Sequence, residues 1–195
     1  MVPFGHGAPV FPLAHRVRGR YAAGGPGTVE FGSPVPQLAE TPRKGFAERE
    51  LLDWGGVALR LTRIEVIPPT GVLLRPGPVA HLNPGGHEGA SRDEGGERVS
   101  RPPWLLPDHE EWGKYIEGNL VRKAETLGMD PAVKLEAVTR VGSQRSFRVG
   151  GGARPGAPVE MALSGPTETL RTLWSRGLGQ ANAAGFGWII PHPTR

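Results

Sequence analysis

The sequence predicts an α+β protein with two ferredoxin-like halves in tandem, the first lacking the leading strand and helix of the βαββαβ unit. Two observations lead to this fold class. The second half of the chain alternates apolar strands with amphipathic helices in the order strand, helix, strands, helix, strand. The first half offers only strand, strand, helix, strand. We therefore expect residues 1–70 to form the incomplete half and residues 71–195 to form the second.

The elements of the first half are short and are separated by glycine and proline. An apolar cluster at residues 10–14 precedes a strand expected at residues 28–31, which a Gly-Ser-Pro sequence ends. Residues 37–52 have a helical composition, and Pro42 is expected to kink or divide that helix. Alternating apolar residues over 57–67 predict a longer strand, and their change of phase indicates a bulge within it.

The second half opens with a strand candidate at residues 72–80, and glycine pairs among mixed charges then predict a flexible loop over residues 82–104. After that loop and a long helix, the sequence again alternates in the manner of short strands. The remaining elements, in chain order, are strands at residues 133–141, 145–149 and 159–163, a helix at 167–175 and a closing strand at 188–190.

The long helix is the clearest element of the second half and is expected over residues 108–127. Asp108 and Glu111 have the spacing of a capping box at its start, and Gly128 is placed to end it. An apolar stripe on one face of this helix predicts the side that meets the core. Its members are Trp112, Ile116 and Leu120.

The composition limits the functional classes. Lys and Arg number 23 against 19 Asp and Glu, a formal charge of +4, which suits a polyanionic partner but equally suits an ordinary soluble protein. The absence of cysteine excludes disulfides and thiolate metal sites, and no His-Glu-x-x-His sequence occurs, so neither a metal nor a cofactor is predicted. No stretch approaches the roughly 20 apolar residues of a membrane span. We expect a cytoplasmic protein without a membrane partner.

Two Gly-x-Gly pairs near the end of the chain carry most of the functional signal. They are Gly177-Leu178-Gly179 and Gly185-Phe186-Gly187, between a helix and an apolar segment. Glycine lets backbone N–H groups approach a phosphate or a base closely. Walker and Rossmann loops are excluded because they leave a strand and open a helix. A connection without a ligand is the alternative, but the double pair favours a backbone platform for RNA.

This double pair resembles the signature of the RAMP superfamily of CRISPR-associated proteins, and more closely that of its repeat-processing endoribonucleases, the Cas6 family. Three further stretches are similar to that family, and the resemblance covers residues 28–190 apart from 83–103. These stretches are Phe31–Pro34 with Pro36–Glu40, Asn119-Leu120 with Lys123, and Leu163–Pro166 followed by Leu170, Leu173 and Trp174.

The resemblance implies metal-independent cleavage of CRISPR repeat RNA. The 2′-hydroxyl beside the scissile phosphate attacks it, leaving a 2′,3′-cyclic or 3′-phosphate and a 5′-hydroxyl. Such internal attack needs proton transfer between oxygens and a cation on the developing charge, and a histidine can exchange a proton near neutral pH. One alternative is a non-catalytic RAMP subunit that holds guide RNA beside other subunits of an effector complex. A more remote one is a general binder of single-stranded RNA.

In the family, the proton-transfer histidine precedes a phenylalanine-containing strand, for which residues 10–14 are the best match here. His6 is therefore the first catalytic candidate, and His15 with its neighbour Arg16 is the second. The residues expected to bind RNA are Arg18, Arg20, Arg140, Arg145, Arg148, Arg176, Gly177, Gly179, Asn182, Gly185 and Gly187. For each arginine, the alternative is a solvated surface.

The sequence departs from the family at Ala181, where many relatives carry Lys or Arg. Contacts of the loop to phosphate are then expected to come mostly from its backbone. The five tryptophans, Trp54 among them, are expected in the core or in interfaces rather than as platforms for bases.

Overall fold

The computed structural model describes residues 3–17, 20–54, 56–67, 105–149, 152–179 and 181–190. The strand expected at residues 72–80 and the loop expected at residues 82–104 lie outside the described residues, and so does Arg18. No described helix is long and apolar enough to cross a membrane.

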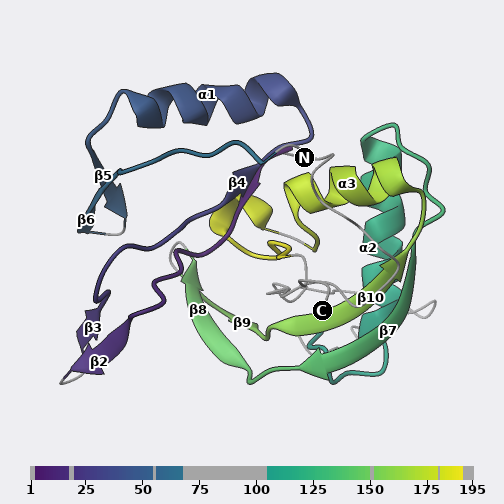
Figure 1. Ribbon diagram of the computed structural model, residues 1–195. Coiled ribbons are helices and arrows are strands. Elements are labelled where there is room, and N and C mark those ends of the chain that lie inside the picture. Colours follow the sequence, from purple (N-terminus) through teal and green to yellow (C-terminus); the bar gives the residue numbers. More distant parts are fainter. Residues whose placement is uncertain are drawn as a thin grey trace.

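The described chain is a mixture of helices and antiparallel strand pairs, as the predicted α+β class requires (Figure 1). The helices are α1 (Pro36–Ala47), α2 (Trp112–Thr126) and α3 (Thr167–Arg176), with a 3₁₀ turn η2 (Asn182–Ala184). The paired strands are β1 (Gly5–His6) with β4 (Phe31–Gly32), β2 (His15–Val17) with β3 (Arg20–Ala22), β5 (Leu51–Trp54) with β6 (Val57–Arg60), β7 (Lys134–Val141) with β10 (Val159–Ser164), and β8 (Arg145–Val149) with β9 (Gly152–Gly156).

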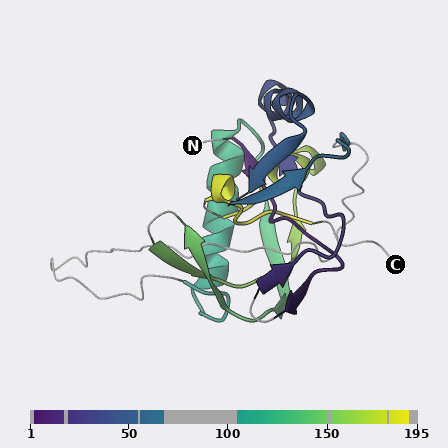
Figure 2. The ribbon, with the colours of Figure 1, turned by 90° about the vertical axis from the view of Figure 1, so that its left-hand side faces the viewer.

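The main core lies between α2, the β7–β10 pair and α3, which Figures 1 and 2 show packed together. The predicted apolar stripe of α2 is confirmed, because Trp112, Ile116 and Leu120 are each at most 2% exposed. They pack against Val159 and Met161 of β10, among other side chains. Burial of this stripe, rather than helix propensity alone, is what stabilises α2.

The two ends of α2 differ in how well the sequence predicted them. The helix begins at Trp112, and its N-cap residue Glu111 makes no side-chain capping bond, so the capping box predicted from Asp108 is wrong. The predicted end is confirmed, since Gly128 has φ +67° and its N–H donates to the Glu125 carbonyl at 3.0 Å. The left-handed backbone that ends a helix in this way favours glycine.

The first half departs most from prediction. Helix α1 runs through Pro42 without being divided. It has no buried residue, so solvent can satisfy the carbonyl that Pro42 leaves without a donor. Residues 51 and 52, expected to end this helix, belong instead to β5 (Leu51–Trp54). A turn at Gly56 (φ +85°) pairs β5 with β6, which ends at Arg60, so the long bulged strand predicted over residues 57–67 is wrong.

Pairing near the N-terminus is shorter than predicted. Val10 and Thr28 form a single bridge between residues 10–14 and 28–31, and Phe31, the last residue of the second stretch, pairs with His6 as part of β1–β4. In the second half, β7, β8, β10 and α3 match the predicted elements closely, whereas β9 was not predicted.

The closing strand predicted at residues 188–190 is wrong. These residues form no strand, although Trp188 and Ile189 are only 7% and 4% exposed. A short apolar run is expected both in a buried segment and in a paired strand, so the sequence pattern does not distinguish the two.

Candidate functional site at the glycine loop

The glycine loop, residues 177–187, follows α3 and contains η2; Gln180 within it lies outside the described residues. The Leu178 N–H donates to the Gly187 carbonyl at 2.7 Å and so closes the loop upon itself. Gly187 has φ +66°, and a Cβ there would lie 1.8 Å from the Leu178 oxygen. No side chain fits in that position, so glycine is needed for the closure itself.

Helix α2 holds the loop through two buried polar side chains. Lys123 Nζ donates to the Gly177 carbonyl at 2.7 Å and to Asn182 Oδ1 at 2.6 Å. Asn119, one helical turn earlier, accepts a hydrogen bond from the Gly179 N–H at 3.1 Å. Residues four apart share a helix face, so α2 presents both groups to the loop at once.

Asn182 connects the two arms of the loop. Its Nδ2 donates to the Leu178 carbonyl at 2.7 Å and to the Phe186 carbonyl at 2.8 Å, while its Oδ1 accepts from Lys123. Both amide protons are therefore used inside the protein, and the side chain is only 8% exposed. The prediction that the Asn182 side chain binds RNA is not supported; it is a structural centre of the loop.

Most of the loop's backbone donors are also engaged. Among the described residues of the loop, six N–H groups donate to protein oxygens. They belong to Gly177, Leu178, Gly179, Ala184, Gly185 and Phe186. The predicted platform of backbone N–H groups for phosphate is therefore not open at Gly177, Gly179 and Gly185. The glycines instead permit tight closure and close approach of neighbouring segments.

Lys123 and Arg176 are two cations in the interior, 2% and 1% exposed. Burial, followed by the charge of Arg176, lowers the pKa of Lys123 to about 7. A neutral amine has two N–H donors, which matches its two acceptors, Gly177 and Asn182. Burial also lowers the pKa of Arg176. The Arg176 side chain is almost fully enclosed, and its contact with RNA stays a prediction.

His6 lies directly against the glycine loop, although the sequence separates them widely. A Cβ on Gly185 would come within 3.0 Å of His6 Cε1. His6 Nδ1 is 2.9 Å from the Gly7 carbonyl, which can only accept, so Nδ1 carries a proton. This tautomer leaves Nε2 as the nitrogen that can take up or release a proton.

Close contacts of Gly5 and Gly32 with the second half of the chain place His6 beside the glycine loop. A Cβ on Gly5 would lie 2.2 Å from the Arg176 carbonyl oxygen, and one on Gly32 would lie 2.2 Å from that of Ser175. Strands β1 and β4 thus pack backbone to backbone against the end of α3. Trp188 adds a polar link, since its Nε1 donates to Glu30 Oε2 at 2.7 Å.

The other catalytic candidates lie elsewhere. His15 is exposed at the start of β2, and Arg16 follows it in the same strand. The β2–β3 hairpin, which also contains Arg20, is at the opposite end of the molecule from α1, with β4 between them (Figures 1 and 2). The structure therefore brings His6, but not His15, to the glycine loop.

Strand β8, which carries arginines in the second half of the chain, reaches the glycine loop. The ring of Phe147 in β8 meets that of Phe186 edge to face, with centroids 5.5 Å apart. Arg145 is exposed in the same strand, and Arg148 also belongs to it. Arg140 in β7 is exposed and pairs with Glu160 at 3.4 Å. Strand β8 therefore brings the exposed Arg145 to the side of the loop, whereas no contact joins Arg140 of β7 to the described residues of the loop.

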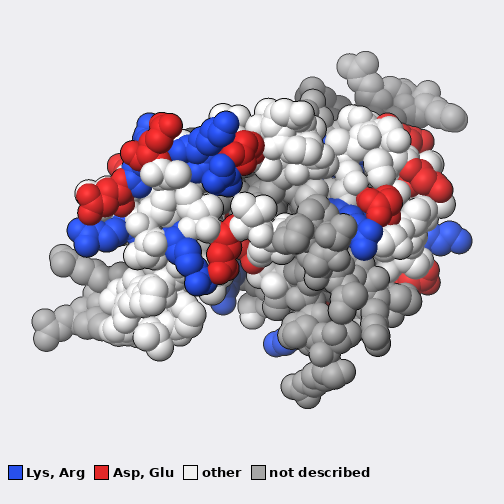
Figure 3. Space-filling model, turned by 45° about the horizontal axis from the view of Figure 1, so that its top comes forward, with Lys and Arg blue, Asp and Glu red and all other residues white. Residues whose placement is uncertain are grey.

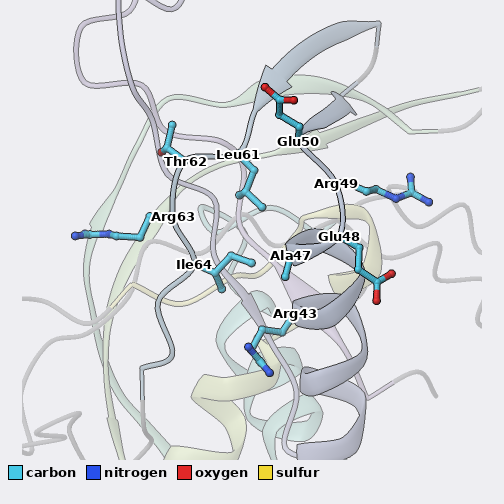
Figure 4. A pocket seen from close by; sticks show the side chains of 9 residues that line it. All are labelled: Arg43, Ala47, Glu48, Arg49, Glu50, Leu61, Thr62, Arg63 and Ile64. Atoms are coloured by element: carbon cyan, nitrogen blue, oxygen red, sulfur yellow. The ribbon is translucent and has the colours of Figure 1, made fainter.

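The face over α1 shows no comparable concentration of one charge. Figure 3 shows positive and negative side chains interspersed there, and Arg60 and Arg63 pair with Glu50 and Glu65. An open pocket lies between the end of α1 and residues 61–64. Ala47, Leu61 and Ile64 point into it while Arg49 and Arg63 point away (Figure 4), so it has an apolar floor, and Glu48 and Glu50 lie at its rim.

Sequence reasoning missed the residues that organise this site. Asn119 and Lys123 were recognised only through a family resemblance, and Trp54, which contacts His6, was assigned to the core or an interface. One signal was present, because Asn119 and Lys123 continue the apolar stripe of α2. Polar side chains on a buried face need partners, which is where the loop bonds arise. Among the described residues, no cluster of metal-ligating side chains forms.

Comparison with known proteins places this arrangement in context. The family model for "CRISPR associated protein Cas6, C-terminal" matches residues 91–190. No curated protein matches the chain. A solved structure of a CRISPR associated protein Cas6 is 16% identical, with a TM-score of 0.79, covering 98% of this chain and 79% of that one.

Two more solved structures agree. The product of a Cas6-related gene from Pyrococcus furiosus is 12% identical, with a TM-score of 0.74 over 99% of this chain and 79% of its own. A RAMP protein described as binding different RNA substrates is 15% identical, with a TM-score of 0.75 over 98% of this chain and 80% of its own. These likenesses confirm the predicted ferredoxin-like α+β fold.

Replacing Lys123 with Met should change how stability depends on pH. In the wild type, Lys123 binds a proton below about pH 7 when folded but below about 10.5 when unfolded. Between these values the unfolded chain holds more protons, so the wild type should gain stability as pH rises from 7 to 10.5. The Met variant should lack this gain. Chemical denaturation of both proteins across that range measures it, and a pH-independent difference between them would contradict the assignment.

Replacing Gly187 with Ala should prevent loop closure. The added Cβ overlaps the Leu178 oxygen and the residue has φ +66°, so the free energy of unfolding should fall by about 3 kcal/mol or more. Gly45→Ala is the matched control, because nothing lies within 4 Å of its Cβ position in α1. That variant should gain about 0.5–1 kcal/mol. Equal stability of the Gly187 variant and the wild type would refute the closure.

Proposed function

The chain belongs to the Cas6 family of CRISPR-associated proteins, and on this basis we propose that it binds CRISPR repeat RNA and cleaves it beside the glycine loop. The observation that carries the proposal is the contact between His6 and Gly185. This contact places a side chain that can transfer a proton beside the glycine loop. The double glycine pair of that loop resembles the family signature.

Two solved structures support the RNA partner. One with the same fold is described as a RAMP protein that binds different RNA substrates. Another, at a TM-score of 0.58 and 16% identity, is described as a Cas6 product complex. In this chain, Arg140, Arg145 and Arg148 would neutralise RNA phosphates, and arginine can also contact base edges.

The proposed reaction needs two proton transfers, one from the attacking oxygen and one to the departing oxygen. The 2′-oxygen loses its proton, bonds to the adjacent phosphorus, and the bond from phosphorus to the 5′-oxygen breaks. The departing oxygen must gain a proton. His6 Nε2 would perform one of these transfers, because its Nδ1 is held by the Gly7 carbonyl. This reaction scheme uses no metal ion. Its products are a 2′,3′-cyclic phosphate and a 5′-hydroxyl, which account for the bond formed, the bond broken and the protons moved.

The non-catalytic alternative, a subunit that holds guide RNA, is favoured by one observation. The hydrogen bond and ring contacts of His6 involve Gly7, Phe31 and Trp54, none of which is charged. A developing negative charge would then need a cation brought by another part of the chain or by a partner. His15 and Arg16 lie on the β2–β3 hairpin, which the structure does not bring to the glycine loop. They therefore remain secondary catalytic proposals.

Substituting His6 with Ala separates these functions. In a buffer that contains EDTA, the wild type should cleave repeat RNA, and the His6 variant should be slower by about 10²- to 10⁴-fold because proton transfer is lost. His15→Ala tests the secondary candidate in parallel: it should cleave like the wild type if His6 transfers the proton, and a loss of cleavage confined to this variant would assign that role to His15. Single-turnover cleavage measures the rate, and filter binding measures affinity. Tight binding without any cleavage by the wild type would establish the non-catalytic alternative.

A further inference from the structure

The imidazole of His6 has little to fix its orientation within its own strand. Its ring makes a hydrogen bond with the carbonyl of the next residue, Gly7. Its strand, β1, is two residues long and pairs only through Gly5 with Gly32 and His6 with Phe31. A side chain with two rotatable bonds needs further contacts to hold one rotamer.

Three surfaces enclose the ring from different elements. Gly185 of the glycine loop lies against Cε1. Phe31, the cross-strand neighbour, has its ring centroid 5.8 Å away at an angle of 41°. Trp54, the last residue of β5, has its centroid 5.5 Å away and its plane nearly perpendicular, at 87°. Such an edge-to-face arrangement is a favoured and orientation-dependent contact between rings.

Trp54 differs from the other two surfaces because its element is separate. Among the described strands, β5 and β6 pair only with each other, whereas Phe31 belongs to the same strand pair as His6 and also packs on Phe46. Trp54 reaches Phe31 as well, with centroids 6.2 Å apart. The hairpin therefore places one half-buried indole across both rings without contributing to β1–β4 pairing.

We propose that Trp54 is a positioning residue for His6, holding the imidazole so that Nε2 points toward the RNA. This inference rests on the proposed function of His6 as the proton-transfer group. A displaced base or acid loses rate steeply, because proton transfer requires hydrogen-bond distance in the reacting complex. The role of Trp54 is thus to narrow the orientations of His6 rather than to exchange a proton.

The chain offers a conservative variant and a matched control. Trp54→Phe keeps an aromatic edge, and Trp54→Ala removes the ring. Val57 is the direct cross-strand partner of Trp54 and is 58% exposed, so Val57→Ala changes the same hairpin while leaving in place the indole that contacts His6. Circular dichroism and thermal unfolding of each variant establish that the hairpin and the fold are retained.

The first readout separates rate from affinity. Trp54→Ala should lower the single-turnover rate at saturating repeat RNA by between about twofold and about tenfold, the range expected for one aromatic pair. Binding of RNA with a 2′-deoxy group at the cleaved nucleotide should be unchanged. Trp54→Phe should restore most of the rate, and Val57→Ala should match the wild type. Weaker binding with an unchanged rate would overturn the proposal and make Trp54 an RNA contact.

The second readout does not depend on cleavage. Nitrogen-15 NMR of the histidine ring reports whether Nδ1 or Nε2 carries the proton. In the wild type and in Trp54→Phe, His6 should show the Nδ1-protonated tautomer, and in Trp54→Ala it should show a mixture of tautomers. An unchanged His6 spectrum in a folded Trp54→Ala protein would overturn the proposal. If the wild type fails to cleave RNA while its tautomer responds as expected, only the proposed function fails.

Discussion

The buried amine of Lys123 is the contact on which the candidate site depends. It connects α2, the longest described helix, to the carbonyl of Gly177 and to the amide of Asn182. Asn182 in turn holds both arms of the glycine loop. A buried polar group that loses its partners costs about 1–3 kcal/mol, so the loop, Asn182 and Lys123 stabilise one another. The segment that the sequence predicts to be a backbone platform for RNA is itself a folded, internally hydrogen-bonded loop.

That scaffold explains how residues from opposite ends of the sequence meet. The end of α3 offers backbone carbonyls, and Gly5 and Gly32 approach them more closely than any side chain would allow. His6 then lies on Gly185, and the hairpin of Trp54 covers its other side. On the far flank, Phe147 of the arginine-bearing strand contacts Phe186. The loop thus contacts His6 through Gly185 and strand β8 through Phe186.

Local patterns predicted the second half well. The apolar stripe of α2, the strands at 134–141 and 159–164 and the glycine end of α2 follow from spacing and turn chemistry. The failures have a common origin in long-range contacts. Trp188 and Ile189 are buried without strand pairing, and the side chains of Arg176 and Asn182, expected to bind RNA, lie in the interior. No local pattern predicts that His6 packs on Gly185, because this contact between strand β1 and the glycine loop arises from the packing of the two halves.

A double-mutant cycle between Lys123→Met and Asn182→Ala tests this account most directly. If the two side chains act as one unit holding the loop, the losses in unfolding free energy should not add, with a coupling of about 1 kcal/mol or more. Each single variant would already remove much of what the other supports. Additivity within about 0.5 kcal/mol would contradict the account and would make the loop's order independent of Lys123.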